Sequence, residues 1–172
     1  LSSECSIDFA SFQEAFLYSD ISSYLESDKL LIVVNDAHRS TPTPLILQWL
    51  KELTPIQFEK ATFLVACGTH ALPSATEYQK IFGNLYGEIK DSIFAHDCHD
   101  KSSVELIGTD SFGEKFFLNK LLVEHDKILT INSVEPHYFA GYTGGRKSLV
   151  PGVADFKTIE RNHNLANSLD CA

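Results

Sequence analysis

Two short, continuous runs of apolar residues, at 29–35 and 61–67, are rich in Val, Ile, Leu and Phe and are bounded by polar turns. Such runs are typical of strands that are buried on both faces, as in a parallel sheet. Between them, residues 43–53 place Leu45 and Trp49 at helical spacing, after a proline-containing start that suits a first helical turn. The pattern predicts the order strand, helix, strand.

The rest of the chain continues this alternation in shorter segments. We expect helices at residues 74–82 and 121–124, and a last helix that begins at Phe156 after Asp155 as its cap and runs to about residue 168. We expect further strands at residues 92–95, 104–107, 114–118 and 127–131. The alternation predicts an α/β fold, Rossmann-like, with an open, mainly parallel sheet and helices on both faces.

The composition suits a single α/β domain over residues 1–172. With 44% apolar residues, a chain of this length can bury a core. The formal net charge of -9 argues against nucleic-acid binding and leaves any phosphate to local groups, so the expected partner is a small molecule. No apolar run approaches the length of a membrane span, and no export signal is evident at the start.

The cysteines bear on the expected compartment. Cys5, Cys67, Cys98 and Cys171 show no paired spacing, which argues against a disulfide framework or a structural zinc site and favours a reducing cytoplasm. Because the chain has no Met and its last helical pattern runs almost to the end, we expect it to be part of a longer protein.

Polar clusters follow four of the expected strands, each at its carboxyl end. They lie at residues 36–39, 68–70, 96–97 and 133–147. In an open parallel sheet these ends share one edge, where ligands bind. We therefore expect groups that are distant in the sequence to meet in one crevice.

The densest cluster is a glycine-rich segment that reads Gly144-Gly145-Arg146-Lys147 and is preceded by His137. Glycines can bring backbone N–H groups close to an anion, and a lysine there can pair with the anion or attack a carbonyl. The segment is not a Walker loop, because Arg146 stands where that motif needs glycine. A flexible turn with solvated basic residues is the alternative; the nearby histidine favours binding.

Two other histidines admit both structural and chemical roles. His163 follows Phe156 and Ile159 by seven and four residues, so helical geometry turns it inward. It is either a core histidine with satisfied nitrogens or a metal ligand. His70 ends a strand, where it is either a general acid or base near neutral pH or an exposed loop residue.

The loop after the first expected strand carries an acidic residue and a basic residue. Asp36 and Arg39 can form a surface ion pair, or can hold a ribose hydroxyl and an anion. Thr41 lies at a helix start whose N–H groups can bind phosphate, although neighbouring prolines remove two donors. His38 and His125 have no partner in the sequence and are expected in solvent. Residues 96–100 resemble a metal site in composition but not in spacing, and we expect a polar turn.

Together these motifs resemble the amino-terminal domain of the nickel-dependent lactate racemases and related 2-hydroxyacid racemases. The resemblance covers most of the chain. The matching motifs are Asp36-Ala37-His38-Arg39-Ser40-Thr41-Pro42, Gly68-Thr69-His70, His96-Asp97, Pro136-His137, Gly144-Gly145-Arg146-Lys147, Pro151-Gly152 and Asn162-His163. The fixed spacing of the last four makes the likeness specific.

The resemblance implies a nickel-pincer nucleotide cofactor, nickel pyridinium-3,5-bisthiocarboxylic acid mononucleotide. Lys147 would carry it through a covalent thioamide, and His163 would bind the nickel. Further residues expected to contact the cofactor are Asp36, Thr41, Gly144, Gly145 and Arg146. The enzymes that synthesise this cofactor are then expected partners.

The resemblance also implies an isomerase that acts on a small 2-hydroxyacid, with lactate the leading substrate. His70 and His137 would be acid/base residues on opposite sides of the substrate, and Arg39 would bind its anion. A hydride would pass from the substrate carbon to the cofactor pyridinium and return to the opposite face. A carboxy-terminal domain would close the cleft, so the domain alone should turn over poorly if at all.

Two departures from the family pattern bear on the substrate. The family often has Thr where His38 stands, and often Arg after the histidine matched by His70, where this chain has Ala71. Two other classes of function stay open at this point. One is a hydrolase that uses His70, His137 or His163 around zinc, and the other is a noncatalytic nucleotide- or phosphate-binding module.

Overall fold

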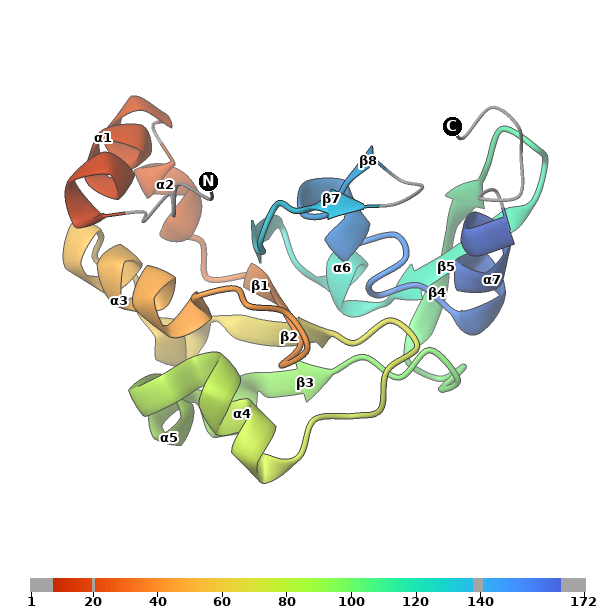
Figure 1. Ribbon diagram of the computed structural model, residues 1–172, viewed down its shortest axis with the longest axis horizontal. Coiled ribbons are helices and arrows are strands. Elements are labelled where there is room, and N and C mark those ends of the chain that lie inside the picture. Colours follow the sequence, from red (N-terminus) through yellow and green to blue (C-terminus); the bar gives the residue numbers. More distant parts are fainter. Residues whose placement is uncertain (1–7, 20, 138–140, 165–172) are drawn as a thin grey trace, which may run out of the picture.

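The computed structural model describes residues 8–19, 21–137 and 141–164, arranged as alternating helices and strands (Figure 1). The helices are α1 (Phe9–Ser19), α2 (Ser22–Leu25), α3 (Thr43–Leu53), α4 (Ala75–Phe82), α5 (Tyr86–Ile89), α6 (Leu121–Glu124) and α7 (Phe156–Asn164). The strands are β1 (Leu30–Asn35), β2 (Thr62–Ala66), β3 (Ile93–Ala95), β4 (Val104–Thr109), β5 (Lys115–Asn119), β6 (Lys127–Ile131), β7 (Pro136–His137) and β8 (Gly141–Tyr142).

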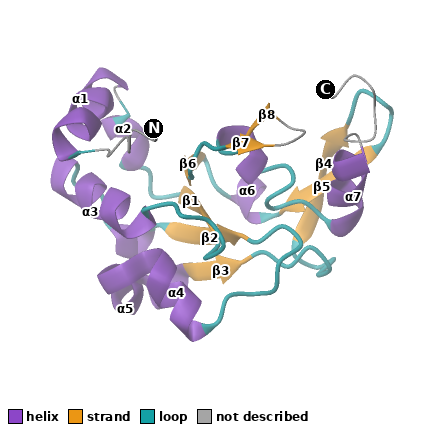
Figure 2. Ribbon diagram, in the orientation of Figure 1, coloured by secondary structure: helices purple, strands orange, loops and turns teal. Residues whose placement is uncertain are grey.

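Four parallel strands form the central sheet, in the order β3-β2-β1-β6 (Figure 2). The predicted α/β class with a parallel sheet is confirmed. β1 lies between β2 and β6, and its five apolar residues are at most 1% exposed. Burial of each such side chain contributes roughly 1.5–3 kcal/mol of transfer free energy, which explains why this run is apolar at every position.

Alternate residues of β1 pack into two different cores. Ile32 and Val34 face a large cluster with Leu47 and Leu50 of α3 and with residues of α4. Leu31 and Val33 face a smaller cluster on the other side of the sheet, which includes Val153, Leu121 and Leu149. Helices therefore cover both faces, although the second face carries only the short α6 and the segment before α7.

The amino-terminal helices α1 and α2 extend the larger core, and the sequence pattern did not predict them. Phe16 and Leu25 are buried in that core, but Leu17 and Tyr18 on α1 are largely exposed. Exposed apolar side chains obscure the helical stripe, which explains the omission. No described helix has the length and apolar character needed to cross a membrane.

The predicted strands at 104–107 and 114–118 form, but they do not join the parallel sheet. β4 and β5 pair with each other in a separate antiparallel sheet. Helix α7 packs on it through Ile159 and Leu118. Asp155 caps α7 as predicted, because its Oδ1 accepts a hydrogen bond from Thr158 N–H at 3.1 Å. The predicted extension of α7 over residues 165–168 lies outside the described residues, as do Cys5 and Cys171.

The strand order creates a switch point between β1 and β6. From β1 the chain proceeds to β2 and β3 on one side, and β6 then adds on the other side of β1. In sheets of this kind the loops beyond the switch point diverge and leave a crevice at the carboxyl ends of the strands. The loops after β1, β2 and β6 carry the clustered polar residues of this chain.

Candidate functional site

A cavity of about 240 Å³ lies at the carboxyl ends of β1 and β2. Its lining includes Asp36, Arg39, His70, His137, Thr143, Gly144, Lys147 and His163, together with Ile159 of α7. Ligand sites commonly measure roughly 300–1,000 Å³, so this cavity is slightly smaller than that range. Segments separated by more than a hundred residues thus meet at one place, as the topology predicts.

The turn that carries Lys147 is held by side-chain hydrogen bonds from the loop after β6. Asn132 Oδ1 accepts a bond from Gly145 N–H at 2.7 Å, and Asn132 Nδ2 donates to Ser148 Oγ at 2.7 Å. Gly144 has φ +80°, and a Cβ there would lie 3.0 Å from the carbonyl oxygen of Ser133. Only glycine fits at that position without strain. The turn therefore depends on Gly144 as well as on the bonds from Asn132.

A second close approach joins this turn to the loop after β2. Gly152 N–H donates to Lys147 O at 3.0 Å, and Gly152 O accepts from Gly68 N–H at 2.9 Å. Gly152 therefore links the backbone of Lys147 to the Gly68-Thr69-His70 loop. The relative position of the lysine and of His70 depends on this contact.

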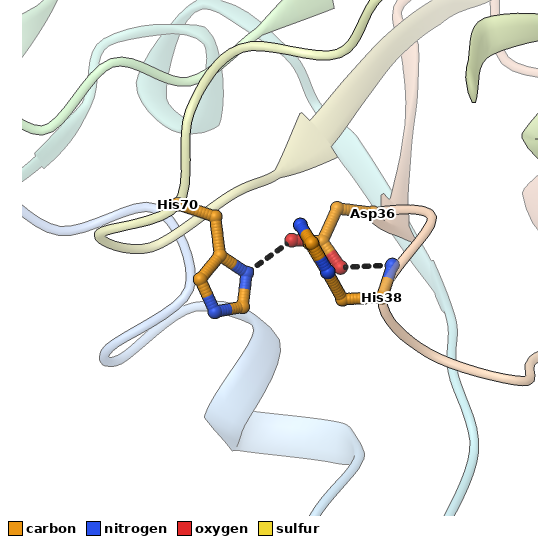
Figure 3. A group of neighbouring side chains, drawn as sticks. All are labelled: Asp36, His38 and His70. Carbon is orange, nitrogen blue, oxygen red and sulfur yellow. Dashed lines mark hydrogen bonds and ion pairs between the residues drawn. The ribbon is translucent and has the colours of Figure 1, made fainter. Parts of the chain in front are cut away.

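The loops after β1 and β2 bring Asp36, His38 and His70 together (Figure 3). His70 Nδ1 lies 2.5 Å from Oδ2 of Asp36, whose side chain is buried. The other carboxylate oxygen accepts a bond from His38 N–H at 3.1 Å. A carboxylate on Nδ1 favours the tautomer that leaves Nε2 for proton exchange.

His38 was expected in solvent without a partner, and that expectation is only half correct. The side chain is exposed, but its ring lies 4.5 Å from the ring of His70, centroid to centroid, at 59°. Asp36 contacts His70 across 34 positions in the sequence, and no local pattern signals such a pairing. The one available signal was the spacing of Asp36 and His38 in a loop at a strand end.

His137 and Lys147 lie in an electropositive part of the cavity. Burial lowers the pKa of His137, and the charges of Lys147, Arg39 and His163 lower it further. Burial also lowers the pKa of Lys147, and the charge of Arg39 adds to the effect. Both shifts favour the neutral forms, which are the forms that accept a proton or act as a nucleophile.

Arg39 forms an ion pair with Glu135 in the loop before β7. Its Nη1 lies 3.4 Å from Glu135 Oε2, and each side chain is 41% exposed. The predicted surface pair with Asp36 is not the one that forms among the described residues, because Asp36 faces His70 instead. Arg39 also lines the cavity, so it can exchange its carboxylate partner for a ligand anion.

His163 lies at the end of α7, one turn after Ile159, and both residues line the cavity. The inward direction expected from helical spacing agrees with that placement. The histidine is nevertheless exposed, and so the alternative of a buried core histidine is excluded. An accessible imidazole at a cavity wall suits a metal ligand.

Three of the residues expected to contact the cofactor lie outside the cavity lining. They are Thr41, Gly145 and Arg146. Thr41 instead joins the loops after β1 and β6, because its Oγ1 accepts bonds from Asn35 Nδ2 at 2.9 Å and Ser133 N–H at 3.0 Å. Arg146 is exposed.

Two histidines that were expected in a polar turn or in solvent are hydrogen-bonded and at least half-buried. His96, expected in a polar turn, is fully buried; its Nε2 donates to Ala154 O at 2.8 Å and its Nδ1 accepts from Asn119 Nδ2 at 3.2 Å. Burial lowers its pKa. His125, expected in solvent, is half-buried and bonds to Leu121 O and Thr62 Oγ1.

The cavity and its polar groups define an α/β ligand-binding domain whose site lies at the switch point of a parallel sheet. The model of the lactate racemase N-terminal domain family matches residues 14–170. The chain belongs to this family, which confirms the family inferred from the motifs.

Two curated relatives are similar over most of this chain. A lactate racemase from Thermoanaerobacterium thermosaccharolyticum is 34% identical over 138 residues, and one from Lactiplantibacillus plantarum is 36% identical over 142 residues. Each alignment covers 78% of this chain and 32% of the relative, so the chain spans about a third of the length of these relatives.

Two solved structures share the fold. The lactate racemase apoprotein from T. thermosaccharolyticum has a TM-score of 0.72 and 33% identity, and the match covers 83% of this chain and 35% of that one. A Thermotoga maritima protein has a TM-score of 0.73 and 24% identity, over 93% of this chain and 41% of the other. At that identity the second likeness shows the fold alone.

Proposed function

We propose that this chain is the cofactor-binding domain of a 2-hydroxyacid racemase or epimerase that depends on a nickel-pincer nucleotide, with lactate as the leading substrate. One observation carries the proposal: a lysine, three histidines and an arginine, drawn from separate segments, line a single cavity. They are Lys147, His70, His137, His163 and Arg39. The family assignment supports the same activity, since its curated relatives are lactate racemases.

The residues of the cavity fit the proposed cofactor. The lowered pKa of Lys147 increases the neutral amine that must attack an acyl carbon. His163 offers an accessible imidazole for nickel at the lining of the same cavity. At Gly68 and Gly144, both of which have positive φ, the cavity is lined by backbone alone. When bound, this cofactor supplies a group that accepts and returns a hydride.

His70 and His137 act as the proton acceptors and donors for the substrate hydroxyl. His70 uses Nε2, because Asp36 holds Nδ1. His137 lies in the strand β7, and burial together with its cationic neighbours lowers its pKa, which favours the neutral imidazole. Two bases from different segments can each serve one enantiomer, which is what racemisation requires.

Arg39 binds the substrate carboxylate. The guanidinium pairs with the carboxylate of Glu135, and this contact with a carboxylate supports the proposed role. The positive lining gives the site a local preference for anions, although the chain as a whole carries -9.

The metal-ligand set expected for a zinc hydrolase differs from the one that the described residues form. The metal-capable group found among the described residues is Asp36, His38 and His70, rather than His70, His137 and His163. A binding-only module would need no acid/base histidines, so mutation of those residues separates it from the racemase.

The test uses full-length protein made together with the cofactor-synthesis enzymes, assayed with each lactate enantiomer. We expect His70→Ala and His137→Ala each to reduce kcat by 10²–10⁴-fold, as is usual for loss of a general acid or base, while nickel content is unchanged. His99→Ala is the matched control, since His99 is exposed and outside the cavity. Full activity in either cavity variant would overturn the two-base mechanism, and zinc-dependent hydrolytic activity without racemisation would favour the hydrolase.

A further inference from the structure

We propose that Asp36, His38 and His70 form a second metal site, which takes a borderline transition-metal ion such as Zn²⁺ at the rim of the cavity. Each residue offers one ligand atom, and the three atoms lie within 4.8 Å of one another. His38 does not line the cavity, whereas Asp36 and His70 do. The three ligands do not include His163, the residue proposed to bind nickel.

The chemistry of the donors selects the ion. Two imidazoles and one carboxylate match the three protein ligands of zinc sites that keep an open position. Mg²⁺ and Ca²⁺ need mostly oxygen ligands, and only one side chain here supplies them. Because His38 and His70 are exposed, solvent can reach the ion and complete its coordination.

The geometry is close to that of a bound site before any ion enters. Ligand atoms about 2.1 Å from a tetrahedral ion lie about 3.4 Å apart, so the widest spacing must contract by at most about 1.4 Å and the Asp36–His70 pair, at 2.5 Å, must open by about 1 Å. The exposed rings of His38 and His70 can make that movement, while Asp36 is anchored. Its buried carboxylate is oriented by the backbone N–H of His38 at 3.1 Å.

The ion would replace the proton between Asp36 and His70. Oδ2 and Nδ1 lie 2.5 Å apart, and a proton on Nδ1 makes the hydrogen bond between them. Metal binding at Nδ1 moves the proton of a neutral imidazole to Nε2, and takes the carboxylate away from its role of orienting the imidazole. If His70 is the acid/base of the proposed function, an ion here inhibits the enzyme.

A substitution at the exposed position of His38 tests the site. His38→Thr removes one ligand without disturbing a buried side chain. Loss of one ligand should weaken binding by at least about 10-fold, since loss of an outer-sphere partner alone weakens metal sites by roughly 10–100-fold.

The experiment measures metal binding on metal-free, full-length protein made without the cofactor-synthesis enzymes. We titrate it with Zn²⁺ by calorimetry and with Co²⁺ by visible absorption. We expect one equivalent to bind, with at least about 10-fold weaker binding in His38→Thr and in Asp36→Asn, and unchanged binding in His163→Ala. Circular dichroism verifies that each variant is folded. No binding, or binding that survives His38→Thr, would overturn the site, as would binding lost only in His163→Ala.

A second measurement separates this proposal from the proposed function. Zn²⁺ is added to the cofactor-loaded enzyme and then removed with a chelator. Reversible inhibition that is weaker in His38→Thr supports the site and the role of His70 together. Stoichiometric binding without inhibition supports the metal site and contradicts the acid/base role of His70.

Discussion

Replacement of Gly152 by alanine tests the backbone contact that positions Lys147 against the loop of His70. A Cβ on Gly152 would lie 2.4 Å from Ser148 O and 2.9 Å from its carbonyl carbon. Ordinary contact begins near 3.4 Å, so these backbones must separate by about 1 Å. That movement disrupts the bonds from Gly152 to Lys147 and Gly68.

The magnitude follows from the two effects together. Overpacking costs about 1–3 kcal/mol, and each lost backbone hydrogen bond about 0.5–1.5 kcal/mol. We expect Gly152→Ala to lower the free energy of unfolding by about 2–6 kcal/mol, which is roughly 4–24 °C in Tm for a domain of this size. The proposed attachment of cofactor to Lys147 should fall as well, because the amine is displaced.

Urea denaturation followed by circular dichroism measures the loss. Gly87→Ala is the matched control, because Gly87 lies in α5 without a positive φ and a Cβ there meets nothing within 4 Å. It should be neutral or stabilising by up to about 1 kcal/mol. A Gly152→Ala protein within 0.5 kcal/mol of wild type, a margin typical of ordinary surface changes, would refute the packing described for this turn.

Three further predictions concern groups around the site. Thr41→Val leaves two donors without their acceptor and should cost about 1–3 kcal/mol in urea denaturation, whereas Thr41→Ser should retain most of the stability. Because the pKa of His96 is lowered in the folded state, the unfolded state binds more protons in mildly acidic solution. The free energy of unfolding should therefore fall as the pH drops below 6.5 and through the lowered folded pKa. The fall should be shallower in His96→Gln, and an equal slope in that variant would contradict this origin. Glu135→Gln breaks an exposed ion pair with Arg39 and should change the free energy of unfolding by less than about 1 kcal/mol, so a larger loss would show that the pair is structural.

The sequence predicted the elements whose apolar pattern is set by burial on one or both faces. β1 and β6 were expected within one residue of their observed bounds, and α3 at its exact bounds, because the core dictates each apolar position. The partners of β4 and β5 were not predictable, since half-exposed short strands carry no signal of which strand they join. Helix α1 was not predicted, because it exposes large apolar side chains that obscure the helical pattern.

The convergence of the site was predicted in part, while its finer contacts were not. Strand ends in a parallel sheet share an edge, and this rule placed Lys147 and His70 together, but the cluster at 96–97 was wrongly expected there and lies outside the cavity lining. The pairing of His70 with Asp36 and the burial of His96 depend on residues far away in the chain. A single sequence read locally contains no signal for either.

The most direct test of the central claim is the intact mass of the full-length protein made together with the cofactor-synthesis enzymes, followed by peptide mapping. We predict a mass increase equal to one cofactor, located on Lys147 and absent from Lys147→Arg, with one nickel per adduct that is lost in His163→Ala while the adduct persists. An unmodified Lys147 in protein that racemises lactate, or an adduct on another residue, would contradict the account.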